Sequence, residues 1–267
     1  SPARPLDSNE AGGENQLRQA GAILKDSFGR VINNLRISVT DRCNFRCRYC
    51  MPEEGMKWLD RKELLSYEEL SRVAKIFSEL GVVKIRLTGG EPLMRKELHE
   101  LVRQISALPG IHDLALTTNG FFLAEQAEGL FAAGLGRINI SLDSLDPVKF
   151  NLMTRRNYYD RVWEGIEAVA RLGIRPVKIN VVLIRGINDD EIVKFAHLAR
   201  SGDYVVRFIE FMPIGADDGW APDRVVPTSE VIHKIERGTG IKMVPLERHG
   251  VQPADRYKFE DGPGEIG

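Results

Sequence analysis

Three cysteines are the residues of this sequence best suited to chemistry, and all lie within one short segment. They are Cys43, Cys47 and Cys50, and the rest of the 267-residue chain holds no other cysteine. An odd number of cysteines in one loop cannot build a framework of disulfides. Thiolates spaced C-x3-C-x2-C can instead hold three irons of a four-iron cube, whereas an ordinary electron-transfer cluster uses four cysteines. The spacing therefore predicts an iron–sulfur cluster with one iron left open for a further ligand.

Two other fates of these thiols stay open at the level of the sequence. Two of the three could pair by oxidation, or a structural zinc ion could bind in place of the cluster. Structural zinc takes four ligands, often as two separated pairs, and the five histidines show no partner pair at finger spacing. The pattern favours the cluster over both alternatives.

A glycine-rich turn is the second segment of interest. Thr88-Gly-Gly-Glu-Pro-Leu93 follows a β-branched run and precedes a helical one. Paired glycines allow the backbone to approach a ligand closely. We expect Glu91 to shape this turn rather than to act as a general acid. The turn therefore predicts ligand contacts made by its backbone.

Short β-branched runs alternate along the chain with longer segments of helical periodicity. The predicted strands cover residues 34–40, 83–88, 114–118, 137–142, 177–183 and 205–211. The predicted helices lie between them, at 67–80, 95–107, 124–133, 161–171 and 190–200. The first helix opens with the capping-box pattern Ser66-Tyr-Glu-Glu69. Strands joined by helical crossovers predict a parallel sheet, and no G-x-G-x-x-G follows the first strand. The predicted fold class is α/β, a partial (β/α)6 TIM-like barrel with functional groups at the strand C-terminal ends.

Alternation within these strands divides the side chains between two faces. One face of each strand is apolar and is expected to pack under the helices, while the polar face lines a cavity. Arg36, Arg86 and Lys178 come from three different strands yet share the polar face. Cations arranged in this way suit an anionic ligand. The opposite assignment, with polar side chains at solvated edges, stays open here.

Composition excludes several classes of partner. The net charge is −1, with 43% hydrophobic and 28% charged residues, so no global field attracts nucleic acid or an anionic membrane. No apolar run approaches the roughly 18 residues that a membrane span needs. Residues 1–25 predict a flexible N-terminal tail without the apolar centre of a signal peptide. A cytoplasmic protein is expected.

The cysteine triad after the first strand and the Gly-Gly-Glu turn after the second resemble the radical S-adenosylmethionine (SAM) superfamily. Longer segments resemble the GTP 3′,8-cyclase family within it, over roughly residues 26–267. They include Leu35-Arg-Ile-Ser-Val-Thr-Asp-Arg-Cys-Asn44, Ile85-Arg-Leu-Thr-Gly-Gly-Glu-Pro-Leu93 and Arg207-Phe-Ile-Glu-Phe-Met-Pro213. The last of these is the most particular to that family. The resemblance implies a radical SAM partial barrel over residues 26–225 and the start of a C-terminal extension over 226–267.

The resemblance also implies cofactors, a substrate and the residues that hold them. The cofactors would be a [4Fe–4S] cluster on Cys43, Cys47 and Cys50, and SAM. The family's substrate is GTP: a 5′-deoxyadenosyl radical takes hydrogen from ribose C3′, which then attacks guanine C8 in the first step of molybdenum cofactor biosynthesis. Matching motif positions give the SAM residues Tyr49, Gly90, Ser141 and Met212. They give the GTP residues Arg36, Arg86, Thr117 and Lys178.

Partners and alternatives complete these expectations. The implied functional partner is the next pathway enzyme, cyclic pyranopterin monophosphate synthase, and a homodimer is one alternative for the assembly. Arg207 has the opposite parity from Glu210 and Met212 and receives no role. A radical SAM enzyme acting on another substrate, such as a peptide, and a metal-binding module without enzymatic activity stay open as other functions.

One feature departs from the family pattern. The family carries a second [4Fe–4S] cluster bound by three cysteines of a C-terminal extension, and no cysteine follows Cys50 in this sequence. If the chain ends at Gly267, we expect it to form 5′-deoxyadenosine slowly and uncoupled from GTP. Cyclisation needs the ribose held in near-attack geometry, whereas radical formation does not.

Overall fold

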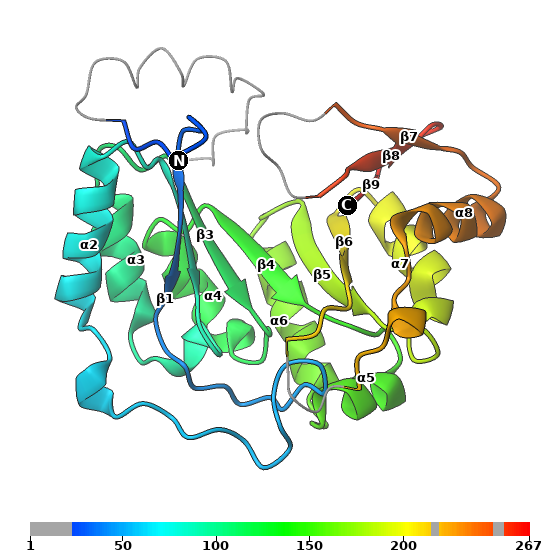
Figure 1. Ribbon diagram of the computed structural model, residues 1–267, viewed down its shortest axis with the longest axis horizontal. Helices are drawn as coiled ribbons and strands as arrows, with labels where there is room; N and C mark the ends of the chain where they lie inside the picture. Colours follow the sequence, from blue (N-terminus) through cyan, green and yellow to red (C-terminus); the bar gives the residue numbers. More distant parts are fainter. Residues whose placement is uncertain (1–22, 215–218, 248–253) are drawn as a thin grey trace.

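The computed structural model describes residues 23–214, 219–247 and 254–267 (Figure 1). Most of the tail predicted for residues 1–25 lies outside the described residues. Within them, one large hydrophobic core lies between a sheet and the helices that cover it. The elements below position the polar groups at the ends of the strands.

A nine-stranded sheet forms the framework, in the order β1-β2-β3-β4-β5-β6-β9-β8-β7. Its first six strands run parallel to one another, as the sequence predicts. Their bounds are Asn34–Ser38 (β1), Lys84–Thr88 (β2), Asp113–Thr118 (β3), Arg137–Ser141 (β4), Val177–Leu183 (β5) and Tyr204–Glu210 (β6). An open sheet of this kind confirms the partial barrel.

The sheet continues beyond the six predicted strands. β9 (Glu265–Ile266) pairs in parallel with β6, and β8 (Tyr257–Phe259) and β7 (Met243–Pro245) follow as antiparallel strands. These three strands are too short for an alternating pattern to show in the sequence. Residues of the predicted 226–267 segment therefore lie in the same sheet as the barrel strands.

Helices connect successive strands and cover one face of the sheet (Figure 1). Five of them were predicted: α2 (Tyr67–Glu79), α3 (Leu98–Ser106), α4 (Leu123–Ala132), α6 (Tyr159–Arg171) and α7 (Ile192–Arg200). Two were not, α5 (Pro147–Thr154) and α8 (Thr228–Thr239). The predicted capping box is present, since the backbone N–H of Glu69 donates to Ser66 Oγ at 3.2 Å. No helix in the described part of the chain is long and apolar enough to cross a membrane.

Burial confirms the predicted division of the strands into two faces. Ile85 and Leu87 of β2 and Ile179 of β5 are buried, while the polar residues that alternate with them are half-buried. The apolar face therefore belongs to the core under the helices, and the polar face lines the inner side of the open barrel. In Figure 1 the arrowheads of β1 to β4 point toward the long loop that follows β1. That loop carries the three cysteines.

Candidate active site

The loop after β1 carries all three thiols, although no three His, Cys, Asp or Glu side chains among the described residues are already grouped as a metal site. Cys43, Cys47 and Cys50 form no disulfide, and the turn between the last two is closed by the Cys50 N–H donating to the Cys47 carbonyl at 3.0 Å. Burial raises the pKa of each thiol, and mutual repulsion raises the pKa values of Cys43 and Cys47 further. The metal-free thiols are therefore protonated near neutral pH and release their protons when iron binds.

Two arginines at the C-terminal end of α5 donate hydrogen bonds to the backbone of the cysteine loop. The Arg155 guanidinium donates to the carbonyls of Arg46 and Met51 at 3.2 and 3.1 Å. Arg156 Nε donates to the carbonyl of Asn44 at 3.0 Å. These bonds fix the backbone on both sides of Cys47. These contacts could not be predicted from the sequence, because α5 itself was not predicted.

The glycine turn after β2 packs directly on the cysteine loop. The Gly90 N–H donates to the Thr40 carbonyl at 2.7 Å. A Cβ atom added at Gly90 would lie 2.3 Å from the Arg42 carbonyl oxygen and 2.4 Å from that of Asp41. No side chain fits into this contact, so the glycine is required by close packing of two backbones.

We expect Gly90→Ala to loosen the cysteine loop. The added methyl group must push one backbone segment away, which should lower the free energy of unfolding by about 1–3 kcal/mol and reduce iron loading. Urea unfolding and iron content on the same preparation measure both effects. Gly129→Ala is the matched control, because Gly129 lies in α4 and, apart from the backbone of its own helix, no described atom lies within 4 Å of the new Cβ, so its stability should not fall. Equal iron content and stability in the Gly90 variant would contradict the expectation.

Glu91 organises the glycine turn, as predicted. The side chain is buried and accepts hydrogen bonds from the N–H of Leu93 at 3.0 Å, Thr118 Oγ1 at 2.6 Å and the N–H of Asn119 at 2.7 Å. Burial raises the pKa of this carboxyl to about 7. Asn119 Nδ2 in turn donates to Asn44 Oδ1 at 2.8 Å, which ties the loops after β1 and β3 together.

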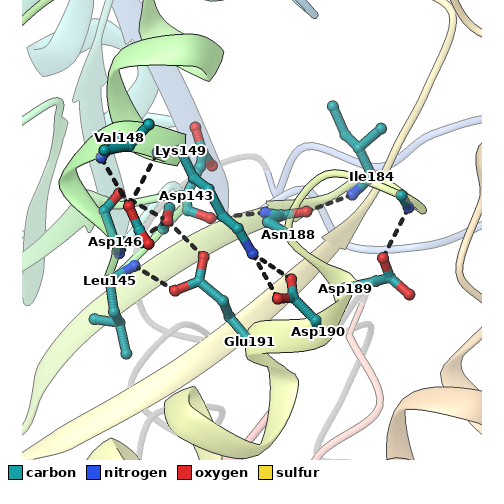
Figure 2. A network of polar contacts seen from close by, with 12 residues as sticks. Asp143, Leu145, Asp146, Val148, Lys149, Ile184, Asn188, Asp189, Asp190 and Glu191 are labelled. Carbon is teal, nitrogen blue, oxygen red and sulfur yellow. Dashed lines mark hydrogen bonds and ion pairs between the residues drawn. The ribbon is translucent and has the colours of Figure 1, made fainter.

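Tyr49 connects the cysteine loop to the end of β4. Its hydroxyl donates to Asp143 Oδ2 at 2.7 Å, and Asp143 Oδ1 accepts from the N–H of Val182 at 2.8 Å. Burial raises the pKa of Asp143 to about 6. Asn188 Nδ2 donates to the Asp143 carbonyl at 2.7 Å, as Figure 2 shows, and so holds the residue that accepts from Tyr49. A buried carboxylate thereby fixes the ring that lies between two of the cysteines.

The remaining SAM candidates lie at the ends of other strands. Ser141 is the last residue of β4, half-buried and paired in register with Asn180. Met212 lies two residues beyond β6 and is 46% exposed, while its neighbour Phe211 is buried against the cluster of side chains that includes Tyr49. The structure thus brings Tyr49, Gly90 and Ser141 to the same end of the barrel. Met212 lies at the end of the strand on the far side of β5.

Cations line the inner face of the sheet in successive rows, from that of Arg36 and Arg137 to that of Ser141, in which Arg207 lies. Register places Arg36 beside Arg86 and, one strand beyond Ala115, Arg137 in the same row. Lys178 and Arg207 extend this set on β5 and β6. We call Arg36, Arg86, Arg137, Lys178 and Arg207 the lumen cations. They confirm that cationic side chains of several strands gather on one face.

The lumen cations repel one another. The pKa of Arg86 is lowered first by burial and then by repulsion from Arg36, Arg137 and Arg207. The pKa of Lys178 is lowered to about 8, first by burial and then by repulsion from Arg207 and Arg137. Arg137 is neutralised in part by an ion pair with Asp113, whereas Arg207 Nε has no hydrogen-bond partner among the described residues. An anion of several charges would relieve this repulsion.

Two of these cations were not assigned from the sequence. Parity separates Arg207 from Glu210 and Met212, and the register agrees, since Arg207 pairs with Asn180 on the same face as Lys178. Arg137 opens its strand and was grouped with no ligand. Arg207 could have been placed on the same face as Lys178 only if the register between β5 and β6 had been known.

The residues present fit a cluster that also binds a small polar ligand. Three unpaired thiols share one loop. Three buried polar atoms of the same loop, Asp41 Oδ1, Arg42 Nε and Asn44 Nδ2, have no hydrogen-bond partner in the part of the chain that the structure describes. Buried polar atoms are normally paired, so these are available to a bound group. By donor chemistry, the cysteine loop would hold a [4Fe–4S] cluster and SAM, and the cations of the same face would hold an anionic substrate.

The fold resembles several solved structures. A structure of TYW1 with a lysine-pyruvate adduct bound has a TM-score of 0.57 at 17% identity, over 79% of this chain and 76% of that chain. Methylornithine synthase (PylB) has a TM-score of 0.57 at 14% identity, over 85% and 76% of the two chains. SuiB of Streptococcus suis, bound to S-adenosylmethionine, has a TM-score of 0.58 at 16% identity over 80% of this chain and 47% of that chain. These similarities establish the fold.

Proteins related in sequence identify the family of this chain. The radical SAM superfamily model matches residues 37–199. GTP 3′,8-cyclase of Pelotomaculum thermopropionicum is 48% identical over 244 residues, which are 91% of this chain and 75% of that protein. The enzyme of Syntrophomonas wolfei is 50% identical over 91% of this chain and 74% of its own length. GTP 3′,8-cyclase 1 of Mycobacterium tuberculosis is 44% identical over 90% and 67%. The chain therefore belongs to the radical SAM superfamily and, within it, to the GTP 3′,8-cyclase family.

Proposed function

We propose that this protein converts GTP to 3′,8-cyclo-7,8-dihydro-GTP, the first step of molybdenum cofactor biosynthesis. The proposal rests on one observation, which is that the polar face of the sheet carries a possible cofactor site at the strand ends and a set of cations along its length. The cysteine loop and glycine turn lie at the strand C-terminal ends, and the lumen cations lie along the same face. Family membership and this arrangement together support a nucleotide substrate beside SAM.

Residues around the cysteine loop would hold the cofactors. Cys43, Cys47 and Cys50 hold a [4Fe–4S] cluster, and Tyr49, Gly90, Ser141 and Met212 surround SAM. When bound, the cluster and SAM would supply the radical chemistry that removes hydrogen from ribose C3′, and joining C3′ to guanine C8 would be completed by one electron from a reductant and one proton. The chain's own contribution is to hold the reacting atoms in place and to keep water away from them.

The lumen cations would bind the triphosphate. The GTP residues Arg36, Arg86 and Lys178 present guanidinium and ammonium donors, and Arg137 and Arg207 add two more. Guanidinium groups bind phosphate oxygens in pairs, and lysine adds a point charge. Thr117, one row nearer the strand ends, places a hydroxyl toward the nucleoside.

GTP affinity should fall as pH rises through the pKa of Lys178. In the free protein this pKa lies at about 8, and a bound triphosphate favours the charged form. Binding is therefore strong below about pH 8 and should weaken above it. Anaerobic calorimetric titration between about pH 7 and 9.5 measures the change. Lys178→Arg, which stays charged throughout, should show a flat profile, and an equally flat profile in the wild type would contradict the assignment.

Anaerobic reconstitution tests the function itself. The full-length protein is loaded with iron and sulfide, reduced with dithionite and mixed with SAM and GTP, and the products are identified by mass. The expected products are 5′-deoxyadenosine and the cyclised dihydro-GTP. Formation of 5′-deoxyadenosine without any nucleotide product, at full iron loading, would overturn GTP as the substrate.

The proposed product connects the protein to its pathway. Cyclic pyranopterin monophosphate synthase would consume that product, so we propose a functional link between the two enzymes. A cytoplasmic location and a homodimer stay predictions. Fractionation and sedimentation analysis would test them.

A further inference from the structure

Asn139 is a buried amide whose hydrogen bonds are incomplete. It lies in β4 and is 1% exposed. Its Oδ1 has no hydrogen-bond partner among the described residues, and its Nδ2 makes only two long contacts of 3.4 Å, to the Leu116 carbonyl and Thr117 Oγ1. A buried acceptor without a partner destabilises the fold, and such atoms are rare in native proteins. This one points to a donor that arrives with a ligand.

The position of Asn139 along β4 indicates which part of a ligand it would meet. Inward residues of a strand follow one another at roughly 6.5–7 Å, so Arg137, Asn139 and Ser141 mark three successive levels. Arg137 belongs to the lumen cations, and Ser141 ends the strand beside the SAM candidates. Register places Asn139 between Thr117 of β3 and Lys178 of β5. The amide therefore lies beside Lys178, one level nearer the strand ends than Arg137 and one level short of Ser141.

This level matches the sugar of the proposed substrate. With the triphosphate on the row of Arg36, Arg86 and Arg137 and the adenosyl group near the strand ends, the ribose would lie between them, at the level of Asn139 and Lys178. We propose that Asn139 Oδ1 accepts a hydrogen bond from a ribose hydroxyl of the bound nucleotide and so orients the sugar. The inference rests on the proposed function and names a contact that selects ribonucleotides over deoxyribonucleotides.

Orientation of the ribose matters for the reaction because only one hydrogen is to be removed. A hydroxyl on C2′ or C3′ turns with the ring, so an acceptor fixed by burial in the sheet restricts the direction of the C3′–H bond. Such positioning raises the fraction of near-attack geometries. A misplaced sugar would leave the radical to react elsewhere.

Binding of deoxynucleotides tests the contact without chemistry. Dissociation constants of GTP, 2′-deoxy-GTP and 3′-deoxy-GTP are measured by calorimetry on the unreduced, cluster-loaded, full-length protein. The wild type should bind at least one deoxy analogue roughly 3- to 10-fold more weakly than GTP. Asn139→Ala should remove this difference by weakening GTP and the analogue that keeps the contacted hydroxyl, while the analogue without that hydroxyl binds as before. Asn139→Asp keeps the acceptor and should keep the ratio, even where its charge changes all three affinities.

Asn151→Ala provides a matched control. Asn151 also has an unpartnered Oδ1, but it lies on α5, so its loss should leave the ratio unchanged. A wild type that binds all three nucleotides equally, or an Asn139→Ala variant that keeps the wild-type ratio, would overturn the contact. If Asn139→Ala does not fold, the wild-type and Asn139→Asp ratios decide. Product formation from GTP with an unaltered ratio would reject only this inference, whereas a wild type that does not bind GTP would reject the proposed function and the contact with it.

Discussion

Replacing any one of the three loop cysteines with serine is expected to abolish formation of 5′-deoxyadenosine. A serine hydroxyl is a poor ligand for iron compared with a thiolate, so the cube would lose an iron or fail to assemble. No other cysteine exists in the sequence to replace Cys43, Cys47 or Cys50. Iron content, the absorbance of the cluster and 5′-deoxyadenosine released after reduction with dithionite are measured on the same sample.

Arg48→Ala is the control for this experiment. Its side chain is exposed in the same loop, while its backbone N–H keeps the hydrogen bond to the Met153 carbonyl at 2.9 Å. The variant should load iron like the wild type. A Cys47→Ser protein that still released 5′-deoxyadenosine at the wild-type rate would refute the cluster assignment.

Alanine at Arg36, Arg86 or Lys178 is expected to weaken GTP binding roughly 10- to 150-fold and to leave SAM binding nearly unchanged. The loss of one charge-assisted hydrogen bond to phosphate amounts to about 1.5–3 kcal/mol. Arg36 is exposed in the free protein, so solvent screening places it at the lower end of this range. Calorimetric titration with each ligand separates the two effects.

Arg171→Ala is the matched control for the cation variants. That arginine ends α6 and forms an exposed ion pair with Glu167 at 3.6 Å. It carries the same charge as the lumen cations without facing the lumen. Unchanged GTP affinity in all three lumen variants would remove those side chains from the site.

Strand alternation is the part of the fold that the sequence predicted best. Ile85 and Leu87 alternate with Lys84, Arg86 and Thr88 without interruption, so the parity of β2 is unambiguous. Helix α5 was missed because it has only eight residues and no regular apolar stripe. Strands β7 to β9 were missed because pairing, of β9 with β6, β8 with β9 and β7 with β8, and not local pattern makes them strands.

Some residues of the site could likewise be identified from local sequence motifs, whereas others could be identified only from the folded structure. The cysteine spacing and the glycine turn are local motifs and were found from the sequence. Arg137, Asn139 and Arg207 acquire their meaning from register with strands far away in the chain. No pattern around Asn139 distinguishes it from any polar residue of a strand. Only the structure shows that its side-chain Oδ1 lacks a partner among the described residues.

The crowding of the lumen cations has a consequence for the fold as a whole. Repulsion within this set opposes folding of the empty protein, because the unfolded chain separates the same charges. A bound polyanion reverses the effect, and at about 100 times its dissociation constant a ligand adds about 2.7 kcal/mol to stability. The nucleotide then stabilises the folded protein in addition to being its substrate. Cells short of it would hold a larger unfolded fraction of this protein, open to proteases, so the abundance of the protein would follow the supply of its substrate.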